Sequence, residues 1–448
     1  MNKNDIIELE ITGYSSDGSG VGRHAGSVVF VPFSAKGDKL LVKIIKVASR
    51  YLVGRIEEIL TPSPDRVAPS CSFAGKCGGC AFMHVSYGAE LEAKKAFVSD
   101  ALKRLGGLDT EVEAIIGSED VSSYRNKACF PVSLDNGEIK CGFYAPRSHR
   151  IASDDSCAIQ SDVANTVREL TIGFMKLHSI MPYDEKTLCG LVRHVFVRSG
   201  DTVCVMLVLT EEKLPFADEY VTLLRENIAN LQSVVINVNA ASTNVITGDK
   251  YVTLYGDGYM TDTLCGLNFR IAAASFYQVN RRQCERLYTL ALDMADITEN
   301  DTVLDLYCGI GTITLLEAKR AKKAIGVEIV PQAIEDAKKN AKINGIDNAE
   351  FFCGDAASAA RRLKDEGIKA DVVTVDPPRQ GLDADLIDTI SQISPDRLVY
   401  ISCNCATLAR DLKLLSEKGY VATKVTAVDM FPRTKHCEVV CALQRQRG

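Results

Sequence analysis

The sequence predicts an α/β protein whose C-terminal part forms an open, mostly parallel sheet, preceded by a small β-barrel and a mixed α+β segment. From residue 301 onward, short apolar runs typical of buried strands alternate with helical patterns. Between residues 6 and 59, short β-rich runs alternate with glycine-rich turns instead. Alternating strands and helices favour a parallel sheet, whereas short, regularly spaced strands favour a barrel.

The composition is that of an ordinary globular protein: 448 residues allow two to four domains, with 46% hydrophobic and 25% charged residues. The N-terminal run MNKNDIIELE is charged and has no apolar export segment, so we expect a cytoplasmic protein without membrane contact. In that reducing compartment, 16 cysteines favour metal binding or catalysis over disulfides. The net charge of −6 argues against a uniformly basic nucleic-acid binder, but a local basic face can still contact phosphates.

The barrel is predicted over residues 1–62, and Thr61-Pro62-Ser63-Pro64 marks its boundary. The stretch from Lys36 to Arg55 holds a single acid, Asp38, and is the most basic of the chain. Its six basic residues are Lys36, Lys39, Lys43, Lys46, Arg50 and Arg55. They form either a solvated strand face or a surface that follows an RNA backbone without reading its sequence.

A mixed central domain is predicted over residues 63–265, and it begins with a cysteine cluster, C-x5-C-G-G-C. The cluster and the more distant fourth cysteine are Cys71, Cys77, Cys80 and Cys157. Four thiolates can hold a [4Fe-4S] cluster, and zinc accepts the same ligands. Zinc sites more often have a second close cysteine pair or histidines, which favours a structural iron-sulfur cluster. Cys129 and Cys141 are alternatives for the fourth ligand.

Two further features fall in the central segment. Tyr87 to Gly106 predicts an amphipathic helix that stops at Gly106-Gly107. Its expected apolar side comprises Leu91, Phe97, Val98, Ala101, Leu102 and Leu105. Residues 190–210 and 231–255 predict hairpin strands. Tyr124-Arg125-Asn126-Lys127 opens another strand with a polar, aromatic and cationic set that suits RNA, or simply a solvated strand end.

The run DTVLDLYCGIG predicts a strand that ends at Asp305, followed by a glycine turn that opens a helix. Such a turn also occurs in NAD sites. The next strand ends in Glu328, whose carboxylate can accept both hydroxyls of an adenosine ribose, and the third ends at Asp355, a candidate contact to adenine. An acid at the turn and the lack of a phosphate-binding residue favour the cationic S-adenosylmethionine over NAD.

A candidate nucleophile, Cys403, follows the apolar run Leu398–Ile401. Residues just beyond the carboxyl ends of strands in an open α/β sheet face the ligand crevice. A random cysteine is most often a core residue, so the position of Cys403 carries the argument. The preceding strand ends in Asp376-Pro377-Pro378-Arg379, where the prolines hold the carboxylate at the crevice to bind cofactor or substrate.

Four motifs in order resemble those of the RNA uracil-C5 methyltransferases: DLYCGIG, DPPR, SCNxATLARD and FPxTxHxE, with FYQVN before them. Residues 1–62 resemble a TRAM domain, an OB-like RNA-binding barrel, and the cysteine cluster resembles that of the 23S ribosomal RNA branch. The resemblance implies a Rossmann-like class I methyltransferase domain over 266–448 that methylates C5 of a single-stranded or loop uridine in RNA. 23S rRNA is the first expected target and DNA is not expected. A tRNA enzyme, a catalytically silent iron-sulfur RNA-binding protein, and an adenine or cytosine N-methyltransferase are the alternatives.

The resemblance also implies residue roles. The Cys403 thiolate adds to C6 of uracil so that C5 can attack the methyl group, and Glu438 then removes the C5 proton. The residues implied around S-adenosylmethionine are Gln278, Tyr307, Glu328, Asp355 and Asp376. Asn280, Arg281 and Arg282 are implied to face RNA. Cys405 stands where the family motif often has proline, and is the alternative nucleophile.

Overall fold

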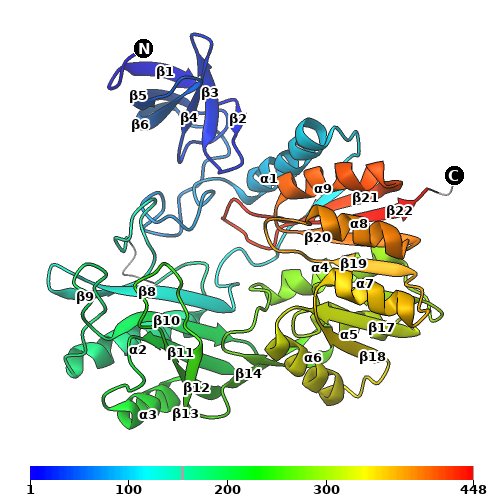
Figure 1. Cartoon of the computed structure of the whole chain (residues 1–448). Coiled ribbons are helices and arrows are strands. Elements are labelled where there is room, and N and C mark those ends of the chain that lie inside the picture. The colour runs from blue at the N-terminus through cyan, green and yellow to red at the C-terminus, as the bar shows by residue number, and fades with distance from the viewer. Residues whose placement is uncertain (153–155, 447–448) are drawn as a thin grey trace.

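The structure, a computed structural model, describes residues 1–152 and 156–446. In this part of the chain the strands form four sheets, arranged as an N-terminal sheet, a central group and a C-terminal sheet covered by helices (Figure 1). The N-terminal sheet stands apart from the other two groups, and the segment that follows it leads to α1 beside the C-terminal sheet.

The N-terminal sheet has six strands in the order β1-β5-β6-β4-β3-β2. Their bounds are β1 Ile6–Glu10, β2 Gly13–Tyr14, β3 Gly20–His24, β4 Ser27–Val31, β5 Lys39–Val47 and β6 Tyr51–Thr61. The sheet curls back on itself: a Cβ added at Gly22 of β3 would lie 2.5 Å from the carbonyl oxygen of Glu10 in β1. Alternating residues of β1, β4 and β5 fill its core. This is the compact β module that the short strands predict.

The central sheet has the order β13-β12-β11-β10-β8-β9. Its elements are β8 Lys127–Asp135, β9 Glu138–Cys141, α2 Asp162–Leu177, β10 Val192–Ser199, β11 Val203–Leu209, α3 Ala217–Asn227, β12 Leu231–Val238 and β13 Lys250–Tyr255. The two expected hairpins, β10–β11 and β12–β13, are present, whereas β11 and β12 run parallel. Helices α2 and α3 cover one face. The other face joins a core shared with β14 (Tyr259–Leu264), β15 (Leu267–Ala272) and the C-terminal part.

The C-terminal sheet has eight strands in the order β18-β17-β16-β19-β20-β22-β21-β7. Its strands are β7 Ala114–Ile116, β16 Thr302–Asp305, β17 Lys323–Glu328, β18 Ala349–Cys353, β19 Val372–Val375, β20 Arg397–Ser402, β21 Tyr420–Val428 and β22 Glu438–Arg445. All neighbours pair in parallel except β22, which is antiparallel to β20 and β21. The strand order reverses between β16 and β19, the place where open α/β sheets bind ligands.

Helices cover both faces of this sheet (Figure 1). One face packs against α4 (Arg281–Ala295), α5 (Thr312–Ala318) and α6 (Pro331–Ile343). The other packs against α7 (Ala356–Asp365), α8 (Ala384–Ile393), α9 (Cys405–Glu417) and α1 (Tyr87–Ala101). None of the helices in the described ranges combines the length and the apolar character that a membrane crossing needs.

Residues 87–116 come from the segment expected to be central, yet they pack on the C-terminal sheet. Helix α1 begins at the N-cap Ser86, continues as a π-helical turn (Leu102–Gly106) and stops at Gly107, whose φ is +64°. Strand β7 then extends the sheet edge beside β21. The expected apolar side of the helix is partly wrong, because Leu105 is 57% exposed while Glu90 and Lys94 are completely buried.

Candidate active site

Cys403 lies in the turn between β20 and α9. The turn is fixed by Asn404, the N-cap of α9, whose side chain accepts a hydrogen bond from the Ala406 amide at 3.0 Å. Ser402, the last residue of β20, pairs with Val439 of β22. Cys403 directly follows Ser402, and Glu438 directly precedes Val439. Cys403 and Glu438 therefore lie at the same edge of the sheet. The structure brings these two predicted residues together.

The thiol of Cys403 is half-buried among carboxylates. Burial, followed by the negative charges of Glu438 and Asp376, raises its pKa to about 11, and the nearby Arg379 opposes this shift. Cys403 is thus a neutral thiol at pH 7 until the surrounding charge changes. A bound cation or protonation of a neighbouring carboxylate would favour the thiolate.

Glu438 is buried at the start of β22, and its Oε2 has no hydrogen-bond partner among the described residues. Burial and the Asp376 carboxylate raise its pKa well above the usual range, while Arg379 lowers it. A buried, unpaired carboxyl oxygen costs free energy unless another group satisfies it. Its position next to Cys403 makes a substrate atom the natural partner.

The DPPR turn reaches the same place from β19. Burial, then the charge of Asp305, raises the pKa of Asp376 to about 7. The carbonyl oxygen of Arg379 accepts hydrogen bonds from Asn404 Nδ2 (3.1 Å) and Thr407 Oγ1 (3.3 Å). The turn is thereby tied to the start of α9, which keeps Asp376 and Arg379 beside Cys403.

A cavity of about 350 Å³ lies at the carboxyl ends of β16, β17 and β18. It brings together Tyr307, Glu328 and Asp355, and Asp383 and Asp385 also line it. The Glu328 carboxylate is oriented by the Gly309 amide (3.3 Å) and the Val330 amide (2.9 Å). Among the described residues the lining holds four carboxylates and no Lys or Arg, which suits a cationic ligand better than a pyrophosphate.

The glycine turn above this cavity needs glycine at position 311, whose φ is +85° and whose added Cβ would lie 3.1 Å from the Phe351 ring. The expectation that Asp305 lies at the mouth of this turn is wrong. Asp305 is completely buried beneath the turn, accepts hydrogen bonds from Thr314 Oγ1 (2.6 Å) and the Tyr307 amide (3.3 Å), and does not line the cavity. Burial raises its pKa to about 6.

The remaining predicted residues are distributed differently. Gln278 is buried before α4 and does not line this cavity; its carbonyl oxygen accepts a hydrogen bond from Asn126 Nδ2. The RNA-facing role expected for Asn280 is wrong, because Asn280 is 3% exposed and caps α4. Arg281 pairs with two aspartates, and Arg282, 65% exposed, pairs with Asp120.

The four predicted cysteine ligands line one cavity of about 300 Å³, which Cys129 and Cys141 do not reach. Across the described residues, no group of three or more His, Cys, Asp or Glu side chains is arranged to hold a single metal ion. Arg125, Arg379 and His436 also line this cavity, so it adjoins the turn that follows Asp376. The sequence did not reveal that contact, although DPPR and FPRTKHCE contain two of these three residues.

Comparison with known proteins agrees with this geometry. The tRNA (uracil-5-)-methyltransferase family model matches residues 86–446, and the TRAM domain model matches residues 2–56. An uncharacterized RNA methyltransferase of Listeria monocytogenes serotype 4b is 45% identical over 446 residues, covering 99% of this chain and 98% of the relative. One from Clostridium tetani is 41% identical over 443 residues, covering 98% and 96%.

Among solved structures, the tRNA (uracil-54, C5)-methyltransferase of Pyrococcus abyssi, in complex with S-adenosyl-L-homocysteine, matches with a TM-score of 0.77. It is 27% identical, and the match covers 98% of this chain and 100% of the neighbour. The match thus includes the N-terminal sheet as well as the two larger parts. With its family model spanning most of the sequence, this chain belongs to the tRNA (uracil-5-)-methyltransferase family and is an RNA methyltransferase.

Proposed function

We propose that the enzyme methylates C5 of a uridine in RNA through a covalent bond between Cys403 and C6, with Glu438 as the base. The observation that supports this most directly is the placement of both side chains at one end of β20 and β22, where the buried Oε2 of Glu438 has no described partner. The family assignment supports the reaction class.

The residue types match the chemistry. The Cys403 thiolate adds to C6, which makes C5 electron-rich enough to attack a methyl group, and S-adenosylmethionine supplies that methyl as a sulfonium. Glu438 then takes the C5 proton, the C5=C6 double bond re-forms, and the C6–S bond breaks to release Cys403. Arg379 lowers the pKa of both Cys403 and Glu438, and so favours the thiolate that adds to C6 and the carboxylate that takes the C5 proton.

For the cofactor we propose the cavity lined by Tyr307, Glu328 and Asp355, with Glu328 holding the ribose hydroxyls. Gln278 and Asp376 are proposed to contact the part of S-adenosylmethionine nearer Cys403. The acidic lining of the cavity supports a sulfonium without phosphates. The solved neighbour, crystallised with S-adenosyl-L-homocysteine, supports the same cofactor class.

We further propose that Cys71, Cys77, Cys80 and Cys157 hold a [4Fe-4S] cluster. A tetrahedral zinc with Zn–S bonds of about 2.3 Å needs its thiolates about 3.8 Å apart, whereas a four-iron cluster holds them at its corners, farther apart. The observation that supports the cluster is that all four cysteines line one cavity. Visible absorption and iron and sulfide analysis of anaerobically purified enzyme test this assignment, and one bound zinc would overturn it.

We propose to divide the chain as 1–62, a TRAM-like barrel for RNA; 63–265, a central domain with the cysteines; and 266–448, the methyltransferase domain to which residues 87–116 are added. Five of the six basic residues between Lys36 and Arg55 are exposed and Lys43 is half-exposed. They are thus available to follow a phosphate backbone.

For the target we propose a uridine of 23S rRNA, because the cysteine cluster resembles that of the 23S rRNA branch. The uridine should lie in a loop or a single strand, because the base must leave its stack to meet Cys403. A tRNA uridine is the second candidate. The tRNA enzyme of Pyrococcus abyssi matches almost the whole chain, including the N-terminal sheet, so that sheet does not distinguish the two targets.

Methyl transfer from isotopically labelled S-adenosylmethionine to unmodified ribosomal and transfer RNA tests both candidates. We expect 5-methyluridine in one of them, identified by mass spectrometry of nucleosides. A label on an exocyclic nitrogen or on a sugar oxygen would overturn the reaction itself.

A further inference from the structure

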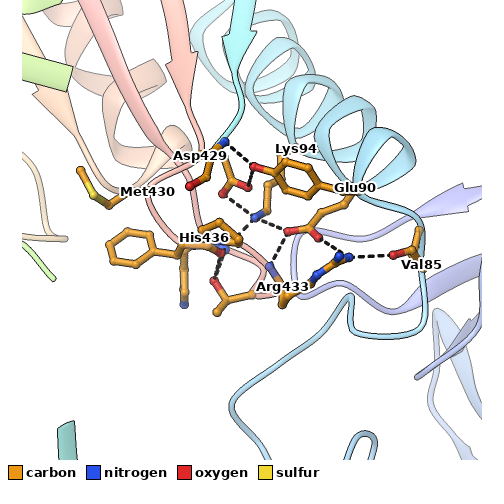
Figure 2. Close-up of polar contacts among 12 residues, drawn as sticks. Val85, Glu90, Lys94, Asp429, Met430, Arg433 and His436 are labelled. Carbon is orange, nitrogen blue, oxygen red and sulfur yellow. Dashed lines mark hydrogen bonds and ion pairs between the residues drawn. The ribbon is translucent and has the colours of Figure 1, made fainter. Parts of the chain in front are cut away.

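A buried cluster of charges lies between α1 and the segment that leads to Glu438 (Figure 2). The Nζ of Lys94 donates to Glu90 Oε1 (2.7 Å), to Asp429 Oδ1 (2.7 Å) and to the carbonyl oxygen of Phe431 (3.1 Å). All three charged side chains are completely buried. Because burying charges is costly and a hydrophobic cluster would often be as stable, their presence calls for a reason other than stability.

The cluster also holds Arg433. Glu90 Oε1 accepts a hydrogen bond from the Arg433 amide at 2.7 Å, and the Arg433 guanidinium donates to the Val85 carbonyl oxygen at 2.9 Å. Arg433 has a φ of +70°, a backbone conformation that costs free energy for a residue other than glycine. The surrounding contacts thus keep the backbone in one strained shape.

Hydrogen bonds hold every backbone carbonyl group of the segment from Asp429 to Arg433. Each of its five successive carbonyl oxygens accepts a hydrogen bond from a residue outside the segment. The donors are Gln283 Nε2 to Asp429, Asn280 Nδ2 to Met430, Lys94 Nζ to Phe431, Tyr124 Oη to Pro432, and the Ala81 and Phe82 amides to Arg433. These donors come from helices α1 and α4, from the residues that precede β8, and from the cysteine loop.

This segment connects β21 directly to Glu438. Val428, the last residue of β21, pairs with Glu438, so Asp429 begins the connection on one side and Glu438 ends it on the other. A shift of the connection would move the Glu438 carboxylate relative to the C5 proton. Displacing a catalytic group by about 1 Å can lower a rate on the order of 100-fold.

We propose that Lys94, together with Glu90 and Asp429, is a positioning element that fixes residues 429–437 and so aims Glu438 at the C5 proton. The proposal rests on the proposed function, in which Glu438 is the base. It assigns α1 a part in one step only: removal of the proton and release of Cys403. Addition of Cys403 and methyl transfer come before that step and do not need Glu438 to be aimed.

Two substrates separate the steps. On RNA with 5-fluorouridine, C5 carries fluorine instead of a proton, so the reaction stops after methyl transfer as a stable Cys403–C6 adduct. On ordinary uridine RNA the reaction proceeds only if Glu438 takes the proton. An enzyme with a misplaced Glu438 therefore forms the fluorinated adduct normally, but accumulates a methylated covalent complex on ordinary RNA.

The test compares Lys94→Met with wild-type enzyme and with Glu438→Gln. For Lys94→Met we expect adduct formation on 5-fluorouridine RNA close to the wild-type rate, turnover on uridine RNA lower on the order of 100-fold, and a trapped methylated complex like that of Glu438→Gln. Equal losses in both assays, without a trapped complex, would overturn the proposal. A wild-type enzyme that forms no adduct would instead refute the proposed function.

Two further variants keep the test decisive. Glu90→Gln keeps the Lys94–Asp429 charge pair and is expected to show a smaller effect in the same direction. If Lys94→Met does not fold and Glu90→Gln traps no complex, the proposal is wrong. Arg397→Met is the matched control, because it breaks a 2.7 Å ion pair with Asp301 at the opposite end of β20. It should lower stability without trapping a complex.

Discussion

The Nη2 of Arg379 lies 3.5 Å from the Nε2 of His436, so the turn after β19 meets the segment that precedes Glu438. Burial, helped by the charge of Arg379, lowers the pKa of His436 to about 4, which leaves the imidazole neutral at pH 7. Arg379 is thus the charged member of this contact. It stands between the cysteine cavity and Cys403.

The first prediction concerns the pH dependence of adduct formation. Because the pKa of Cys403 is raised to about 11, the thiolate fraction and the rate on 5-fluorouridine RNA should rise as the pH increases from 7 to about 9. Arg379 lowers this pKa, so Arg379→Gln should shift the profile to higher pH and reduce the rate at pH 7. Arg320→Gln, which loses only an exposed pair with Asp293, is the control. An unshifted profile would contradict the role given to Arg379.

The second prediction distinguishes the two thiols. Cys403→Ala should abolish both methylation and the covalent adduct while RNA binding persists. Cys405 is the first residue of α9 and packs against the apolar core on that side of the sheet, so Cys405→Ala should retain turnover. Gel analysis of adducts and filter binding of RNA measure the two properties. Turnover by Cys403→Ala would move the nucleophile to Cys405.

The third prediction tests the cofactor cavity. Glu328→Gln keeps the shape but removes the charge that would accept the ribose hydroxyls, and hydrogen bonds to charged groups contribute about 1.5–3 kcal/mol. The KM for S-adenosylmethionine should therefore rise by about 10- to 100-fold, with a smaller change in kcat. Asp365→Asn, which lies outside the lining, serves as the control. A loss confined to kcat would place Glu328 elsewhere in the mechanism.

The sequence predicted the parts of the site that depend on local pattern. DLYCGIG, DPPR and SCNCATLARD each end a strand or open a helix, so their place at the crevice follows from the rule for open α/β sheets. Glu438 was associated with Cys403 through its motif alone, and the structure brings the two residues to the same edge of the sheet. Whether these residues have the proposed roles stays a prediction.

Other features depend on contacts that no local pattern encodes. Lys94 looks like a surface lysine of an amphipathic helix, because its partner Asp429 is 335 residues away. Asn280 follows an RNA-enzyme motif and precedes two arginines, but its side chain caps α4. The sequence places Asp305 as an exposed acid at a glycine turn, yet its side chain is buried and binds Thr314, in the first turn of the next helix. Burial of polar groups is decided by tertiary packing.

The fourth prediction concerns stability. Glu317 is buried under the sheet, its Oε1 accepts a hydrogen bond from Thr374 Oγ1 at 2.6 Å, and burial and the charge of Asp305 raise its pKa to about 8. A carboxyl group that binds its proton more tightly when folded loses its stabilising contribution as the pH rises through the folded pKa. The pKa of Asp305 and that of Asp376 are raised in the same direction. The free energy of unfolding should therefore fall between about pH 5 and pH 8.

Thermal unfolding of the enzyme without cofactor, measured across that pH range, tests this trend. Glu317→Gln removes one titrating group, so its Tm should fall less between pH 5 and pH 8 than that of the wild type. Glu335→Gln removes an exposed carboxylate paired only with Lys338 in the described contacts, and should leave the slope unchanged. Equal slopes for wild type and Glu317→Gln would show that Glu317 keeps an ordinary pKa in the folded enzyme. Bound S-adenosylmethionine should flatten the wild-type slope as well, because its positive charge favours the ionised form of the carboxylates around the crevice.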